Sequence, residues 1–182
     1  MTKRRSMTAL LPLAALCAAA AVRAQAPTAP EVPEAIKAPA GERLLLSAHA
    51  TGAQIYTCGR GSDGQLQWTL KAPEAELRDD QGTVIAHHYA GPAWKYSDGS
   101  EVTGKAAARV DSPDGSIPWL RLVAVSHSGA GLFARVSTIQ RIHTSGGQPP
   151  AAAECGPARE SAEVKVPYSA DYLFYAPAAA AR

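Results

Sequence analysis

The sequence has no long apolar run outside its first 26 residues, no sustained amphipathic helical pattern and no CxxC pair among its three cysteines. Without a later run of about 18 apolar residues, nothing beyond the N-terminus resembles a membrane-spanning helix. The chain also lacks GxSxG and GxxxxGK[ST], and it has no GxGxxG leading from a strand into a helix. A nucleophile elbow, a phosphate-binding loop and a dinucleotide-binding fold are therefore not expected.

Residues 1–26 have the organisation of a secretory signal peptide, with a basic start, an apolar stretch over about Ala9–Val22 and a cleavage position after Ala26. Cys17 follows Leu16, which is too bulky for a lipidation signal. Cleavage removes four basic side chains and no acidic ones, so the formal net charge falls from +2 to −2. We therefore expect an exported protein, periplasmic or extracellular, with no nucleic-acid partner and no membrane span.

Two cysteines, Cys58 and Cys155, remain after cleavage in a compartment that permits oxidation. Only one pairing is possible. A bridge across a loop of that length stabilises a fold by roughly 4 to 5 kcal/mol in the chain-entropy model. The alternative, a thiol pair for catalysis or metal binding, lacks both CxxC spacing and nearby histidines. The sequence thus predicts a structural disulfide.

Between residues 42 and 176 the apolar residues return at every second position. In QLQWTL, Leu66, Trp68 and Leu70 would face the core while the residues between them face water. Clusters of Gly, Asp and Pro separate eight to ten short segments of this kind. The fold class predicted is mostly β, a single-domain antiparallel sandwich or barrel with little helix. Residues 27–41 are predicted to be a Pro/Ala-rich linker, and residues 177–182 a tail.

The stretch HHYAGPAWKYSDGS, residues 87–100, concentrates histidines, aromatics, a Gly-Pro and an Asp-Gly. Neighbouring side chains on a strand project to opposite faces, so one of His87 and His88 should point inward and the other outward. Trp94 follows the Gly-Pro bend, which could present its indole at a loop. This makes Trp94 the leading candidate for a ligand contact.

The first functional hypothesis is an exported binding module for a small molecule, a glycan or a surface. Trp94, Tyr89 and Asp98 would form the site, with help from Tyr168 and Asp171. An alternative role for Asp98 is to cap the backbone of its own turn. An alternative role for Asp171 is simply to begin a strand. No cofactor is expected.

The second hypothesis is a secreted enzyme with a hydrolase-like acid/base site. His88 would act as acid or base, Asp98 would orient it or act as the partner carboxylate, and Arg141 would hold an anionic or carbonyl group. This hypothesis requires the three side chains to converge in one pocket.

A third hypothesis is metal binding. His87 or His88 would then combine with His127 or His143. These histidines have no i, i+2 or i, i+4 spacing, so the pattern for a metal centre is weak and no metal ligands are assigned.

Six segments follow one another along the chain: ATGAQIYTC at 50–58, WTLKAPEA at 68–75, HHYAGPAW with SDGS at 87–100, IPWLRL at 117–122, IQRIHTSGGQPP at 139–150 and VPYSADYLFY at 166–175. In this order they resemble a family of small exported proteins of bacteria and fungi that is catalogued as a domain of unknown function. The resemblance covers nearly all of residues 42–176, and it implies that Cys58, Cys155, GPAW and SDGS belong to the family pattern. It implies no catalytic residue.

Overall fold

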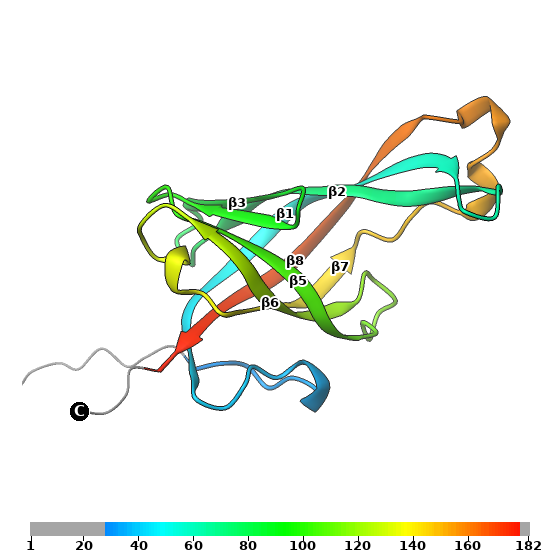
Figure 1. Ribbon diagram of the computed structural model, residues 1–182. Coiled ribbons are helices and arrows are strands. Elements are labelled where there is room, and N and C mark those ends of the chain that lie inside the picture. Colours follow the sequence, from blue (N-terminus) through cyan, green and yellow to red (C-terminus); the bar gives the residue numbers. More distant parts are fainter. Residues whose placement is uncertain (1–27, 179–182) are drawn as a thin grey trace, which may run out of the picture.

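The computed structural model describes residues 28–178, in which eight antiparallel strands form one closed barrel in chain order (Figure 1). The predicted signal peptide, residues 1–26, and most of the predicted tail lie outside the described residues. Among residues 28–178, helix is confined to 3-10 turns, so the mostly β prediction is confirmed. The strands are β1 (Glu42–Arg60), β2 (Leu66–Arg78), β3 (Val84–Tyr89), β4 (Ala93–Tyr96), β5 (Glu101–Val110), β6 (Trp119–Ser128), β7 (Thr138–Gly146) and β8 (Glu163–Pro177), and the 3-10 turns are η1 (Glu34–Ile36), η2 (Phe133–Arg135), η3 (Ala152–Glu154) and η4 (Pro157–Arg159).

The strands number eight, within the predicted eight to ten, and several are longer than the apolar pattern indicates. β1, β2 and β8 each join two segments that the pattern separates, and in β2 a β-bulge between Leu70 and Ala72 marks the place where its two segments meet. β5 was not predicted, because EVTGKAAARV carries alanines and glycine instead of large apolar residues. Leu70 was predicted to face the core and is 49% exposed, so that prediction was wrong.

The barrel interior is filled by alternate residues of each strand. On β8, Tyr172 and Phe174 pack inside, while Leu173 and Tyr175 belong to a second cluster on the outside. Each large apolar side chain removed from water stabilises the fold by roughly 1.5–3 kcal/mol. The interior cluster comprises Ala48, Ala50, Ala75, Leu77, Ala86, Trp94, Val102, Ile117, Leu122, Phe133, Val136, Ile139, Tyr168, Ala170, Tyr172 and Phe174.

The N-terminal arm packs on the outside of the barrel and covers this second cluster. Ile36 of η1 is fully buried, and its carbonyl accepts a hydrogen bond of 2.6 Å from Gln140 Nε2. Gln140 Oε1 in turn accepts a bond from the hydroxyl of Tyr175. The segment predicted as a linker, residues 27–41, therefore supplies a buried side chain to the domain.

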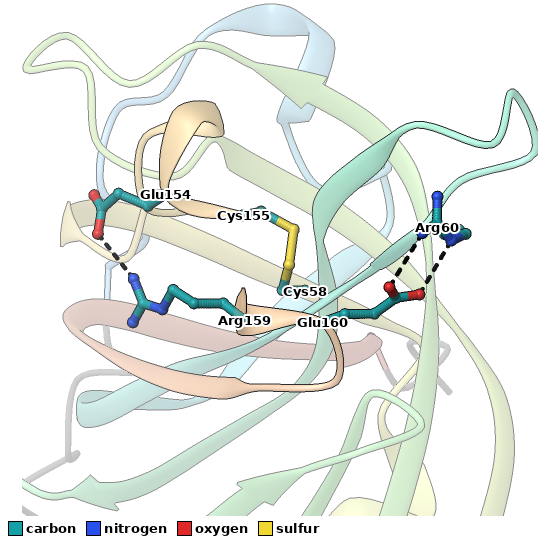
Figure 2. Close-up of a disulfide and its surroundings, with 6 residues drawn as sticks. All are labelled: Cys58, Arg60, Glu154, Cys155, Arg159 and Glu160. Carbon is teal, nitrogen blue, oxygen red and sulfur yellow. Dashed lines mark hydrogen bonds and ion pairs between the residues drawn. A yellow bond between two sulfur atoms is a disulfide. The ribbon is translucent and has the colours of Figure 1, made fainter. Parts of the chain in front are cut away.

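β1, β2 and β8 continue beyond the other strands as an extension, with the orange segment that contains η3 and η4 at its far end (Figure 1). The disulfide between Cys58 and Cys155 ties that segment to β1, with the two Cα atoms 5.4 Å apart. Figure 2 shows the bridge beside the ion pair of Arg60 with Glu160, whose Nε and Oε1 atoms are 3.1 Å apart. The predicted disulfide is thus present.

The barrel wall has a gap between β2 and β5, because the hairpin of β3 and β4 is short. β3 pairs with β2 only over Ala75–Arg78, and β4 pairs with β5 only over Glu101–Thr103. Within residues 28–178, no strand pairs with Leu66–Pro73 on the side away from β1, or with Lys105–Val110 on the side away from β6. These parts of β2 and β5 are therefore strand edges within the barrel wall.

Candidate functional site

A cavity of about 610 Å³ lies at this gap and extends into the barrel. Its size is within the range of small-molecule sites. The side chains at its mouth include exposed apolar residues, Leu70 at 49% and Val125 at 58%. It is lined by Gln54, Leu70, Lys71, Ala72, Pro73, His88, Gly91, Pro92, Trp94, Gly104, Lys105, Ala106, Leu120, Leu122, Val125, Arg141 and Tyr172.

His88 points into the barrel from β3 and is 4% exposed, whereas His87 is exposed, as strand alternation predicts. The Nδ1–H of His88 donates a 2.8 Å hydrogen bond to the carbonyl of Ala93, which leaves Nε2 as the unprotonated nitrogen. Burial lowers the pKa of His88 to about 3; the bond to Ala93 opposes this shift, and the positive charge of Arg141 adds to it. The imidazole is therefore neutral at physiological pH.

Trp94 lies on β4, pairs with His88 across the hairpin and is 1% exposed. The prediction that a loop presents its indole was wrong, because the Gly-Pro bend ends before β4 and strand alternation turns the side chain inward. The ring stacks on His88 and meets Tyr172 edge-on at 5.6 Å between centroids. Trp94 thus forms a wall of the cavity from the inside.

Arg141 enters the cavity from β7. Its Nε and Nη2 donate to the carbonyl of Pro118 at 3.2 and 2.8 Å. Burial raises the pKa of Tyr172, and the charge of Arg141 opposes that shift. The positive charge of Arg141 therefore affects the pKa of both Tyr172 and His88, which line the same cavity.

Sequence reasoning missed Gln54, Tyr172 and Gly104 as site residues. Gln54 is 2% exposed, and its inward position follows only from the register of β1. A Cβ on Gly104 would lie 3.2 Å from a ring carbon of Trp94, so the glycine leaves room for the indole. The glycine and alanines of β5 gave no strand pattern in the sequence, and Gly104 and Ala106 among them leave space for the cavity.

Three predicted residues lie away from this cavity. Asp98 caps the turn after β4: Oδ1 accepts from the backbone N–H and hydroxyl of Ser100, and Oδ2 accepts from the N–H of Leu132 at 2.7 Å. These bonds, that of the Ser100 hydroxyl first, lower the pKa of Asp98. Tyr89 donates to Glu101 and lines a separate groove of about 390 Å³.

The third is Asp171, which lies within β8 on the outer surface rather than at a strand end. It accepts hydrogen bonds of 2.8 Å from Nδ1 of both His49 and His143. Tyr168 is buried inside, and its hydroxyl oxygen lies 3.4 Å from that of Tyr172. The structure therefore brings His88, Trp94 and Arg141 of the predicted residues into one cavity, with Tyr168 behind it.

Comparison with known proteins gives one match. A family model described as "Protein of unknown function (DUF3455)" matches residues 39–176. The chain belongs to this family. Searches of curated proteins and of solved structures found no match to the DUF3455 chain. The resemblance stated from the six sequence segments is confirmed, and the family description carries no activity.

Two further observations concern the described residues of this DUF3455 protein. Within residues 28–178, no group of three or more His, Cys, Asp or Glu side chains is arranged to hold a metal ion. Over the same residues, no helix is both long and apolar enough to cross a membrane. His127, one of the histidines considered as a metal ligand, hydrogen-bonds through Nε2 to the carbonyl of Val136.

Proposed function

We propose that the protein binds a small, largely apolar molecule in the cavity between β2 and β5. The observation that carries this proposal is a cavity of about 610 Å³ whose mouth exposes Leu70 and Val125 to water. Large apolar side chains exposed beside a cavity are stabilised when a ligand covers them. The aromatic and aliphatic walls, interrupted by a few polar groups, match the composition of ligand-binding cavities.

Binding is favoured over acid/base catalysis by the state of His88. A general base works best when its pKa lies near the working pH. The pKa of His88 is about 3, so its imidazole is a weak base. Asp98, the carboxylate that the enzyme hypothesis requires, is engaged by Ser100 and Leu132 in the turn after β4.

A small molecule is favoured over a glycan by the burial of the aromatic rings. Sugar recognition uses exposed aromatic faces on which a ring can stack. Trp94 and Tyr172 are each 1% exposed, and both line the cavity.

We further propose that the protein works after export, in the periplasm or outside the cell. The disulfide of Cys58 and Cys155 is compatible with an oxidising compartment. Fractionation of the producing cells, with N-terminal sequencing of the mature chain, tests this: a chain that begins at residue 27 outside the cytoplasm is expected, and an uncleaved cytoplasmic chain contradicts it.

The binding proposal is tested with N-phenyl-1-naphthylamine, a neutral apolar dye that fluoresces when it leaves water. Ala106 lines the cavity at its mouth, while the neighbouring Ala107 is exposed and does not. Ala106→Trp should block entry and weaken dye binding at least about 10-fold. Ala107→Trp, the matched control, should leave the dissociation constant within about 2-fold of the wild-type value. No dye binding to the wild-type protein, or equal losses in both variants, contradicts the proposal.

A further inference from the structure

The cavity lining carries positive charge and no acidic side chain. Arg141, Lys71 and Lys105 are among its residues, and neither Asp nor Glu occurs there. Lys71 is paired with Glu163 outside the cavity. Within residues 28–178, no carboxylate lies within 4.0 Å of Arg141 or Lys105.

Arg141 is the innermost of these cations. The Pro118 carbonyl occupies its Nε and one N–H of Nη2, and the Tyr172 hydroxyl interacts with the same guanidinium. These two neutral groups do not balance its charge, and a guanidinium has five N–H donors in all. A partly buried cation without a counter-ion is costly, and an anion supplied by a ligand would remove that cost.

Two neutral donors in the same lining also lack partners. The side-chain amide nitrogen of Gln54 and the indole nitrogen of Trp94 are buried and make no hydrogen bond. Both residues are at least 98% buried and line the cavity. Buried polar groups are normally hydrogen-bonded, so each of these donors would gain a hydrogen bond from an accepting group placed beside it.

We propose that the ligand is an apolar monocarboxylate whose carboxylate binds Arg141 and accepts from the amide of Gln54, with its apolar body against Trp94 and Leu122. This inference rests on the proposed binding function and specifies its ligand class. A planar carboxylate fits the fork of a guanidinium, which makes two parallel N–H···O bonds to it.

Displacement of N-phenyl-1-naphthylamine from the intact protein tests the ligand class, with decanoate and methyl decanoate as competitors. These probes share their apolar chain and differ in charge. In the wild-type protein at neutral pH, decanoate should displace the dye at a concentration at least about 10-fold lower than the ester does. Equal or weaker displacement by decanoate overturns the proposed ligand class.

Arg141→Gln tests the residue, because glutamine retains an amide donor for the Pro118 carbonyl while removing the charge. The variant should weaken decanoate binding at least about 10-fold and leave the ester within about 3-fold. Arg109→Gln is the control: it removes the same charge from an exposed residue of β5 outside the cavity lining. A loss shared by decanoate and ester, or equal effects of the two variants, overturns the role of Arg141.

The two proposals fail in different ways. If the dye binds and decanoate shows no preference, the carboxylate inference is wrong and the binding function stands. If neither the dye nor either competitor binds the wild-type protein, the binding function itself is wrong. Should Arg141→Gln fail to fold, the comparison of decanoate with its ester in the wild-type protein still decides the ligand class.

Discussion

The imidazole of His88 lies flat against the indole of Trp94, with ring centroids 4.3 Å apart and an angle of 4° between the planes. The two residues face each other on adjacent strands, and Tyr172 meets both rings edge-on. Aromatic pairs of this kind contribute about 0.5–1.5 kcal/mol beyond the area that they bury. Because His88 is titratable and buried in this pair, the folded protein favours its neutral imidazole over the protonated, charged form.

The stability of the protein is therefore predicted to fall in mild acid. The pKa of His88 is about 6.5 in the unfolded chain and about 3 in the folded protein, so between these values the unfolded state binds more protons. The stabilisation is present above about pH 6.5 and is lost as the pH falls toward 3, at up to about 1.4 kcal/mol per pH unit. Urea unfolding from about pH 7 to about pH 4 measures this slope.

His88→Gln should reduce the slope, because the group that titrates is removed. His87→Gln is the matched control, since His87 is the exposed neighbour on β3. If the free energy of unfolding depended on pH with the same slope in both variants, His88 would not be the group that causes the loss of stability in acid.

Two buried glutamines should respond in opposite ways to replacement by methionine. Gln54 has an unpartnered amide nitrogen, so Gln54→Met should raise the free energy of unfolding by about 1 kcal/mol while weakening decanoate binding. The side chain of Gln140 hydrogen-bonds to both Ile36 and Tyr175, so Gln140→Met should lower the free energy of unfolding by about 1–3 kcal/mol. Urea unfolding of the ligand-free proteins measures both, and destabilisation by Gln54→Met would indicate that its amide is satisfied.

The disulfide should contribute a large share of the stability. It joins residues 97 positions apart, so replacing both Cys58 and Cys155 by serine should cost about 4.7 kcal/mol in the chain-entropy model. Arg60→Gln, which removes the exposed ion pair with Glu160 beside the bridge, should cost no more than about 1 kcal/mol. Comparable losses in the two variants would contradict the loop-closure argument. Alkylation without reductant should leave the mass of the mature protein unchanged.

The N-terminal arm should behave as part of the folded domain. Ile36 is fully buried against the outer cluster, so Ile36→Ala should lower the free energy of unfolding by about 2–4 kcal/mol. Lys37→Ala, a change at the exposed neighbour, should cost less than about 0.5 kcal/mol. Equal and small effects in urea unfolding would show that the arm does not contribute to the stability of the barrel.

The fold class could be predicted from the sequence because turns and strand alternation are local properties. The opposite orientations of His87 and His88 and the turn role of Asp98 follow from the same local rules, and the structure bears them out. The inward position of Trp94 was missed, because it depends on where β4 begins after the Gly-Pro bend.

The composition of the cavity could not be predicted in the same way. Gln54 and Arg141 come from β1 and β7, and only barrel closure and the register of the strands bring them together. The alternating pattern predicts that Leu70 is a core residue. β3 pairs with β2 only from Ala75 onward, so no strand lies beside Leu70 on the side away from β1, and its side chain remains exposed at the cavity mouth. Long-range pairing of this kind has no signature within a single segment.

The gap between β2 and β5 also leaves two strand edges with free backbone hydrogen-bonding groups. Such edges recruit strands from other molecules and cause aggregation unless charged residues or prolines interrupt them. Lys71 and Pro73 lie along one edge, and Lys105 lies on the other. A strand of a second molecule that approached either edge would meet these lysines and the proline, so the side chains that border the entrance also oppose edge-to-edge pairing of two barrels.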